Sequence, residues 1–302
     1  MAITLHQVTK YYDKQKALDE VSFTLKAGRI CGFLGPNGAG KSTTMKIITG
    51  YLSEYTGTVK INDIDLRRHP LEAKKLIGYL PEHNPLYPDM YIREYLEHVA
   101  RLYRVACPRQ KTEEIIGLTG LVPEVKKKIG QLSKGYRQRV GLAQALIHDP
   151  EILILDEPMT GLDPNQLEEI RQLIKTCGKD KTVLLSTHIM QEVEAICDRV
   201  MIINRGKIVA DQSIRAMQSL AGGMLNVYIR FAPGTDSSWL AQSGLFRTLR
   251  QESAEYWQGT ASVKEDPRTE LFNLAARHQC PIIELRTEED NLEKIFRELT
   301  RS

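Results

Sequence analysis

The sequence predicts an α/β fold with a mostly parallel sheet, followed by a small C-terminal α+β domain. Up to about residue 210, short apolar runs alternate with segments of helical pattern. Runs that are apolar throughout suit strands covered on both faces, as in a parallel sheet. Beyond residue 219 this alternation gives way to a different set of strand-like and helical segments. We therefore expect two domains, residues 1–218 and 219–302, which fits a chain of 302 residues at about 150 residues per domain.

The composition excludes several classes of protein. Hydrophobic residues make up 42% and charged residues 26% of the chain, which fits a globular protein and neither a disordered nor a fibrous one. A net charge of +3 is too small to indicate nucleic-acid binding, so no nucleic-acid partner is expected. No apolar stretch reaches about 18 residues, and the first residues lack the pattern of a signal peptide. We expect a cytosolic chain that reaches a membrane only through a partner.

The five cysteines are widely scattered and odd in number. They form no C-x-x-C pair, so neither a disulfide framework nor a zinc site is expected. His278 and Cys280 lie close together, but a metal site needs more ligands. We expect the cysteines to be buried as small apolar residues.

Five apolar runs predict the strands of the parallel sheet, at residues 30–35, 76–81, 152–156, 182–187 and 200–204. Continuous apolar runs of this length are typical of strands that helices cover on both sides. The last run leads through an Arg205-Gly206 turn into a further strand that ends near residue 213.

Between Pro88 and Pro150 such strand-like runs are absent. Within residues 91–104, apolar side chains recur at helical spacing, at Ile92, Tyr95, Leu96, Val99, Leu102 and Tyr103. We expect this stripe to pack into a core. A helical subdomain over about residues 85–150 is therefore predicted inside the α/β domain.

The C-terminal segment begins with an expected linker at residues 219–226. Strands are predicted at 225–231, 256–263 and 281–287, and helices at 266–279 and 291–300. Asp266 is the expected N-cap of the first of these helices, with Pro267 in its first turn. The segment contains no recognisable group of catalytic residues, and we hypothesise a dimerisation or regulatory role for it.

Residues 35–43 read GPNGAGKST and match the G-x-x-x-x-G-K-[ST] pattern of a phosphate-binding loop. An apolar strand precedes the loop, and a helical stretch that ends at Gly50 follows it. Glycines let several backbone N–H groups point into one concavity, and the helix adds the positive end of its dipole. Lys41 would reach the β- and γ-phosphates, and the Ser42 hydroxyl would bind Mg²⁺. The expected nucleotide-binding residues here are Gly35, Pro36, Asn37, Gly38, Ala39, Gly40, Lys41, Ser42 and Thr43.

Residues 152–158, ILILDEP, form an apolar strand that ends in two acids. The carboxyl ends of strands in such sheets gather ligands, so we expect both acids to face the phosphate loop. Asp156 would hold Mg²⁺ through water, and Glu157 would act as the general base on the attacking water.

Residues 132–146, LSKGYRQRVGLAQAL, decide between the classes of nucleotide-binding protein. Ser133 can cap a helix, and Gly135 allows a close backbone approach at the start of that helix. The segment resembles the L-S-G-G-Q signature of ATP-binding cassette (ABC) ATPases. Lys134 and Tyr136 depart from the third and fifth residues of that pattern, and Gln138 lies in the following turn.

Further motifs of the ABC family follow in the expected order. Residues 160–164, TGLDP, resemble the D-loop, in which Asp163 would contact a second subunit. His188 ends a strand like the switch histidine that contacts the γ-phosphate, and Tyr12 resembles the aromatic residue that stacks on adenine. The resemblance covers about residues 3–217 and implies a P-loop NTPase core with an antiparallel β subdomain and a helical subdomain.

The resemblance also implies a head-to-tail dimer, either of two copies or with a paralogous cassette. Two ATP molecules with Mg²⁺ would lie between the subunits. Each ATP would contact Lys41 and Glu157 of one subunit and the signature residues Ser133, Lys134, Gly135 and Gln138 of the other.

Glu82 occupies the position, in GYLPE, where the family usually has a glutamine that contacts Mg²⁺ and the lytic water. A carboxylate can serve both contacts. This loop resembles those of ABC-2-type exporters, and the segment around it resembles the gliding-motility-associated ATP-binding subunit. Leu86, Tyr87, Met90 and Tyr91 follow, and they would expose apolar surface to a short helix of the membrane subunit.

The resemblance therefore implies the ATPase subunit of an exporter-like membrane transporter. Its partner would be an ABC-2-type transmembrane permease, at the cytoplasmic face of the inner membrane. One alternative is a soluble ABC ATPase of translation or DNA repair, although such proteins usually carry two cassettes or a long coiled-coil insertion. Another alternative is an ATP-gated scaffold without hydrolysis, which the presence of Glu157 and His188 disfavours.

Overall fold

The structure of the chain is a computed structural model that describes residues 2–221, 224–262, 266–289 and 292–300. The chain divides into two compact units, Met1–Ile214 and Arg215–Arg301. The segment expected as a linker is only partly described. Helix α8 (Ile214–Ala221) extends into it and strand β11 (Met224–Phe231) begins within it, whereas residues 222–223 lie outside the described residues.

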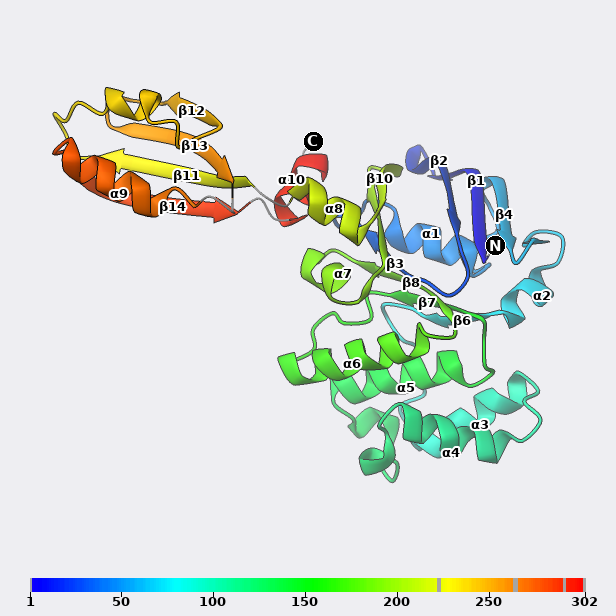
Figure 1. Cartoon of the computed structure of the whole chain (residues 1–302). Helices are drawn as coiled ribbons and strands as arrows, with labels where there is room; N and C mark the ends of the chain where they lie inside the picture. Colours follow the sequence, from blue (N-terminus) through cyan, green and yellow to red (C-terminus); the bar gives the residue numbers. More distant parts are fainter. Residues whose placement is uncertain (1, 222–223, 263–265, 290–291, 301–302) are drawn as a thin grey trace. The chain divides into compact units, whose positions relative to one another are not determined.

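A six-stranded sheet forms the centre of the first unit (Figure 1), in the order β10-β9-β3-β8-β7-β6. The strands are β3 (Ile30–Leu34), β6 (Ile77–Leu80), β7 (Ile152–Asp156), β8 (Thr182–Thr187), β9 (Arg199–Asn204) and β10 (Lys207–Ser213). All neighbouring strands pair in parallel except the hairpin β9-β10. The structure thus confirms the α/β fold, and each of the five apolar runs forms a strand of this sheet.

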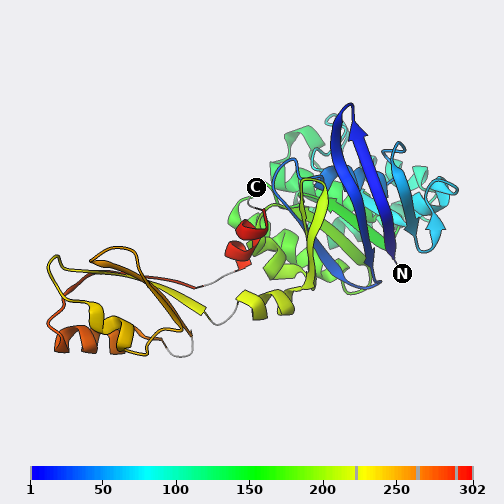
Figure 2. The same ribbon diagram turned by 90° about the horizontal axis from the view of Figure 1, so that it is seen from above.

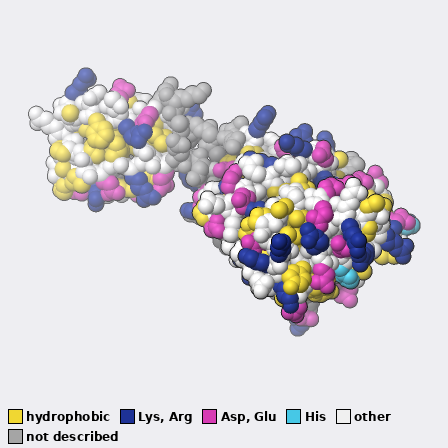
Figure 3. All heavy atoms as spheres, turned by 90° about the horizontal axis from the view of Figure 1, so that it is seen from below, with side chains coloured by type: hydrophobic (Ala, Val, Ile, Leu, Met, Phe, Trp, Pro, Cys, Tyr) yellow, Lys and Arg dark blue, Asp and Glu magenta, His cyan; other side chains and the backbone are white. Residues whose placement is uncertain are grey.

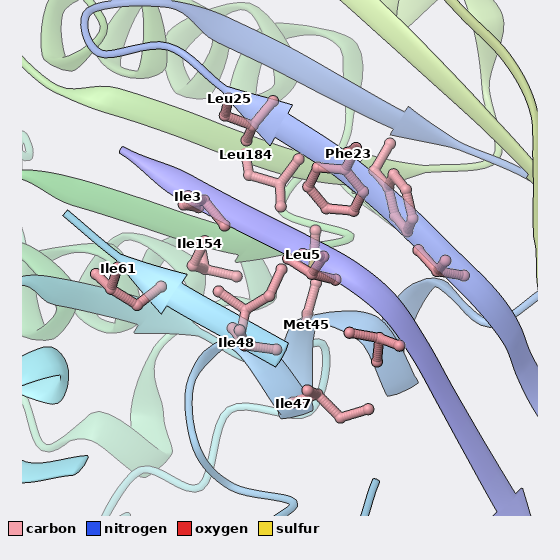
Figure 4. Packing of buried hydrophobic residues seen from close by; sticks show 14 of the residues in the cluster. Ile3, Leu5, Phe23, Leu25, Met45, Ile47, Ile48, Ile61, Ile154 and Leu184 are labelled. Carbon is pink, nitrogen blue, oxygen red and sulfur yellow. The ribbon is translucent and has the colours of Figure 1, made fainter. Parts of the chain in front are cut away.

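A second sheet of four antiparallel strands lies beside the first (Figure 2), in the order β2-β1-β4-β5. Its strands are β1 (Ile3–Tyr12), β2 (Gln15–Leu25), β4 (Thr56–Ile61) and β5 (Ile64–Asp65). Helix α1 (Lys41–Ile48) packs between the two sheets. Figure 4 shows that its buried side chains Met45, Ile47 and Ile48 meet Leu5 of the antiparallel sheet and Ile154 of the parallel one. This core fixes the start of α1, and therefore the loop before it, against the parallel sheet.

Helices cover the other face of the parallel sheet (Figure 1). The helical subdomain consists of α3 (Ile92–Leu102), α4 (Pro108–Leu118), the short η1 (Val122–Glu124) and η2 (Ile129–Gln131), and α5 (Lys134–Leu146), and it is followed by α6 (Pro164–Cys177) and α7 (Met190–Ile196). Helix α2 (Pro70–Lys75) instead contacts β5 and β6, and its Ala73 is buried in the core between the two sheets. Within the part of the chain that the structure describes, no helix is both long and apolar enough to cross a membrane.

The predicted apolar stripe of residues 91–104 is correct only over its first part. Ile92, Tyr95, Leu96 and Val99 are buried, as expected. The prediction was wrong for the last two positions, since Leu102 is 68% exposed and Tyr103 stacks on His148 at the surface. Helix α3 ends at Leu102 and Tyr103 is its C-cap residue, so both exposed positions lie at the very end of the helix. Figure 3 looks onto the unit from this side and shows hydrophobic side chains among charged ones.

The cysteines follow the expected pattern with one exception. Cys31, Cys177, Cys197 and Cys280 are buried free thiols, whereas Cys107 is exposed. Burial raises the pKa of Cys31 to about 12, so this thiol stays protonated and behaves as an apolar side chain.

Two glycines provide a test of the packing described here. A Cβ added at Gly78 would overlap the carbonyl oxygen of Ala145, whereas one added at Gly117 of α4 would meet nothing within 4 Å. We expect Gly78→Ala to lower the free energy of unfolding by about 1–3 kcal/mol through overpacking. Gly117→Ala should raise it by up to about 1 kcal/mol, because alanine favours a helix over glycine. Urea unfolding of both variants measures whether the free energy of unfolding changes in opposite directions. An equal change in the two variants would contradict the close packing at Gly78.

The second unit contains a four-stranded antiparallel sheet in the order β12-β13-β11-β14. The further elements are η3 (Ser238–Gln242), β12 (Thr248–Gln251), β13 (Tyr256–Ser262), α9 (Arg268–Arg277), β14 (Ile282–Glu289) and α10 (Leu292–Thr300). The succession strand–helix–strand–strand–helix–strand in this spatial order is the split βαβ arrangement. The expected N-cap was wrong, because Pro267 occupies that position. Asp266 instead accepts a hydrogen bond from the Arg268 N–H.

Candidate active site

The predicted site residues meet at one edge of the parallel sheet. Leu34 of β3 pairs with Thr187 of β8, and Asp156 of β7 pairs with Ser186, so the three strands end side by side. The phosphate loop follows β3, the two acids follow β7 and His188 follows β8. Glu157, His188 and part of the phosphate loop line a cavity of about 640 Å³. Its lining residues are Tyr12, Gln15, Lys16, Ala17, Asn37, Gly38, Gly40, Lys41, Ser42, Thr43, Glu82, Glu157, Thr160, His188, Arg205 and Gly206.

The phosphate loop takes its shape from glycine. Gly40 has a φ of 112°, and a Cβ there would lie 2.9 Å from the carbonyl oxygen of Ala17, so only glycine fits. Helix α1 begins at the next residue, which directs its free N–H groups into the cavity. Lys41 is only 6% exposed, and its Nζ donates to the carbonyl oxygens of Gly35 at 2.7 Å and Pro36 at 3.3 Å. The loop therefore presents backbone donors and one cation to an anionic ligand.

Asp156 is held by two hydroxyl groups. Ser186 Oγ donates to its Oδ1 at 2.5 Å, and Ser42 Oγ donates to the same atom at 3.2 Å. Burial raises the pKa of Asp156, although the two hydrogen bonds lower it. The carboxylate and the Ser42 hydroxyl are hard oxygen donors and lie at the phosphate loop, so this pair fits Mg²⁺. Ser186 was not predicted as a site residue.

Glu157 lies at the centre of the polar contacts. Its carboxylate is 3.0 Å from Nδ1 of His188 and 3.5 Å from Nζ of Lys41, and it accepts a hydrogen bond from Thr160 Oγ1 at 2.9 Å. Its φ of 50° is unusual for a residue with a side chain, and its N–H donates to Ser186 Oγ at 2.9 Å. These contacts fix one carboxylate between a histidine and a lysine. Thr160 lies in the TGLDP segment, which is the signal that could have identified it.

Glu82 lies at the exposed rim of the cavity. It also lines a second cavity of about 500 Å³, together with Ser42, Asp156, Tyr51, Tyr79 and Tyr103. The loop that carries Glu82 thus lies between the two cavities. Of the apolar residues predicted to be exposed after Glu82, Tyr87 is 55% exposed and Tyr91 is exposed too, whereas Leu86 and Met90 are partly buried.

Tyr12 and several residues that sequence reasoning missed also line the first cavity. Tyr12 is 45% exposed, which leaves its ring accessible, and Lys10 Nζ lies 5.1 Å from the ring centroid. The missed residues come from the start of β2 and from the β9-β10 turn, and they are Gln15, Lys16, Ala17, Arg205 and Gly206. No local motif marks them, because two hairpins far apart in the sequence bring them together.

Neither the signature residues nor Asp163 of the D-loop segment lines the first cavity. Ser133 caps α5 and accepts a hydrogen bond from Tyr136 N–H at 3.4 Å, as predicted. Gly135 packs against Gln166, whose amide a Cβ there would overlap. Gln138 Nε2 donates to the Pro158 carbonyl oxygen at 3.0 Å.

Asp163 occupies the N-cap position of α6 and accepts a hydrogen bond from the Gln166 N–H at 3.0 Å. Lys134 lies close to Gly161, in the turn before that cap. The starts of α5 and α6 are thus adjacent and are linked through Gln166.

Comparison with known proteins agrees with this geometry. The model of the family described as ABC transporter matches residues 18–160. The linearmycin resistance ATP-binding protein LnrL of Bacillus subtilis (strain 168) is 30% identical over 300 residues, or 97% of this chain and 96% of that protein. The bacitracin transport ATP-binding protein BcrA of Bacillus licheniformis is 37% identical over 206 residues, covering 68% of this chain and 67% of that protein.

Solved structures show the same fold. The ATP-binding cassette MJ0796, in a dimeric post-hydrolysis state bound to ADP and Pi, is 28% identical with a TM-score of 0.65. The match covers 70% of this chain and 99% of that one. An ATP-binding subunit of an ABC transporter is also 28% identical, with a TM-score of 0.66, over 73% of this chain and 93% of that one.

Proposed function

Because this chain belongs to the ABC transporter family, as an ATP-binding subunit with ATPase activity, we propose that it drives an exporter-like permease of the ABC-2 type. The observation that carries the proposal is the convergence of Lys41, Asp156, Glu157 and His188 at one edge of the parallel sheet. A nucleotide cavity next to a carboxylate held between a histidine and a lysine is suited to hydrolysis. The names of relatives that act in resistance and transport favour the exporter role.

The residues around the cavity have distinct proposed roles. The phosphate loop, Gly35 to Thr43, would bind the phosphates through its N–H groups and through Lys41, and Tyr12 would stack on adenine. Ser42, Asp156 and Glu82 would hold Mg²⁺, which when bound neutralises phosphate charge. Glu157 would accept a proton from the attacking water, and His188, hydrogen-bonded to it, would contact the γ-phosphate.

We further propose that two cassettes close on two ATP molecules, as a homodimer or with a paralogous cassette. Ser133, Lys134, Gly135, Gln138 and Asp163 do not line this chain's own nucleotide cavity, which supports a role toward a second cassette. The N–H groups at the start of α5, a helix of 13 residues, would then face the phosphate of the other subunit. The dimeric MJ0796 cassette supports this arrangement.

The proposed contact with the permease lies at the second cavity and the loop after Glu82. Tyr51, Tyr79 and Tyr103 line that cavity, and the exposed Tyr87 follows in the loop. An amphipathic helix of the permease would find apolar surface there, next to the residues proposed to hold Mg²⁺. The chain would then lie at the cytoplasmic face of the inner membrane. Gliding motility is the most specific process that we propose for this transporter.

The domain limits remain a proposal as well. We place the ATPase domain at residues 1–218 and an accessory domain at 219–302, and the separate sheet and core of the second unit support such a division. This accessory domain would serve dimerisation or regulation.

A tagged purification from native membranes in mild detergent tests the transporter role. Mass spectrometry should find a multi-helix membrane protein in stoichiometric amount with the parent chain. Replacing Tyr87 and Tyr91 with serine should reduce its recovery, because both exposed rings lie in the proposed docking loop. Phe272→Ser, at an exposed aromatic residue of α9, is the matched control and should not change it. A chain that arrives with ribosomes or DNA instead would favour the soluble alternative.

A further inference from the structure

The turn between β9 and β10 has an unfavourable sequence for its shape. Asn204 pairs with Lys207, so Arg205 and Gly206 form a two-residue hairpin turn. Their φ angles are 47° and 77°, and both lie in the left-handed region, as in a type I′ turn. Asparagine, aspartate or glycine suits the first of these positions, whereas arginine strains the backbone. The conformation of the turn therefore does not explain why residue 205 is an arginine.

Hydrogen bonds hold this turn against the phosphate loop. The Gly206 N–H donates to the Ala39 carbonyl oxygen at 2.9 Å, and the Gly206 carbonyl oxygen accepts from the Asp19 N–H at 2.9 Å. A Cβ at Gly206 would lie 2.7 Å from the carbonyl oxygen of Ala17, so the turn is closely packed. Arg205 is thereby fixed in the lining of the nucleotide cavity, to which Tyr12 also contributes.

The charge of Arg205 is uncompensated. Its neighbours Lys16 and Lys207 both bind Asp19, at 2.8 Å and 3.0 Å. Arg205 itself is exposed and forms no ion pair with any of the residues described here, 2–221, 224–262, 266–289 and 292–300. Arg205 thus lines the same cavity as the phosphate loop, to which its turn is hydrogen-bonded, and guanidinium groups bind phosphate oxygens well.

We propose that Arg205 is an additional nucleotide-binding residue, whose guanidinium contacts the phosphate chain on its ribose side. The assignment rests on the proposed function, namely that ATP binds in this cavity. The turn that carries Arg205 packs on Ala17 and Asp19 of β2, and the first residue of that strand pairs with Tyr12. Glu157 and His188, the residues placed at the γ-phosphate, instead contact each other, and Glu157 also contacts Lys41. The contact is therefore common to ATP and ADP, and it is independent of the second cassette.

Equilibrium binding of ATP and ADP to the full chain, together with thermal unfolding, tests this proposal. Arg205→Asn gives the turn a residue that it favours, so the variant should unfold at the same temperature or higher. Its Kd values for ATP and ADP should nevertheless both rise, by about 5-fold, and Arg205→Lys should recover part of the loss. The difference from the parent should shrink at about 0.5 M salt, because the contact is exposed.

Lys207→Asn is the matched control, since it removes a cation from the same hairpin that is already paired with Asp19. Its Kd for ATP should stay within about 2-fold of the parent value. Unchanged ATP and ADP binding by a stable Arg205→Asn variant would show that Arg205 serves the turn alone. An equal loss with Lys207→Asn, or an equal loss of adenosine binding, would also overturn the phosphate contact. The Lys41→Ala variant separates failure of the Arg205 proposal from failure of the proposed function. Unchanged ATP binding by Lys41→Ala would contradict the nucleotide site itself.

Discussion

Replacing Glu157 with glutamine should abolish ATP hydrolysis and leave ATP binding almost intact. Glutamine keeps the shape of the side chain, and its amide oxygen can still accept the hydrogen bond from Thr160. It cannot take a proton from water, and general-base catalysis contributes about 10²- to 10⁴-fold to a rate. We therefore expect kcat to fall at least about 100-fold while the Kd for ATP changes by less than about 3-fold.

A steady-state phosphate-release assay and equilibrium binding on the same preparation measure both quantities. Glu168→Gln is the matched control, because that carboxylate is exposed on α6 and does not line the cavity. It should retain parent activity. Hydrolysis by Glu157→Gln within a few-fold of the parent would exclude Glu157 as the general base.

Lys41→Ala should lose ATP binding itself. The Lys41 ammonium group is buried among the loop carbonyl oxygens, so water does not replace it as a phosphate partner. A hydrogen bond to a charged group contributes about 1.5–3 kcal/mol. We expect the Kd for ATP to rise about 10- to 100-fold, with a larger loss for ATP than for AMP, because the side chain would contact the β- and γ-phosphates.

Lys75→Ala, at an exposed lysine of α2, removes the same charge away from the cavity and should bind ATP like the parent. Circular dichroism should show that both variants are folded. A folded Lys41→Ala variant with the parent Kd would contradict the phosphate-loop assignment.

The parallel sheet and its nucleotide edge were predictable because their signals are local. The four residues ILIL are apolar, and they and the following Asp156 are all buried in β7. The antiparallel strands β1 and β2 escaped notice as strands, because in both of them buried and exposed residues are mixed. They were expected only through the family resemblance.

The structure brings the predicted phosphate loop, acids and His188 together at one sheet edge, but several of the contacts there were not predicted. Asp156 and Glu157 follow a readable strand, but the Ser186 bond to Asp156 depends on the register of β7 against β8, which sequence does not reveal. Arg205 reaches the cavity only because its turn is hydrogen-bonded to the phosphate loop. Leu102 was placed in a core by its spacing, although spacing does not tell which positions at the end of a helix other elements cover.

The double contact of Gln166 has a consequence for how two cassettes would associate. The backbone N–H of Gln166 donates a hydrogen bond to the Asp163 carboxylate at 3.0 Å. The side-chain amide of Gln166 lies against Gly135 at the start of the signature helix. The two segments that would meet a second subunit are therefore not independent loops, since a shift of one displaces the other. Because the two segments are already linked, less conformational entropy is lost when they contact a second cassette. More of the free energy of that contact is then available for closing the two cassettes on ATP. The proposed dimerisation surface would in this sense be linked into one unit before its partner arrives.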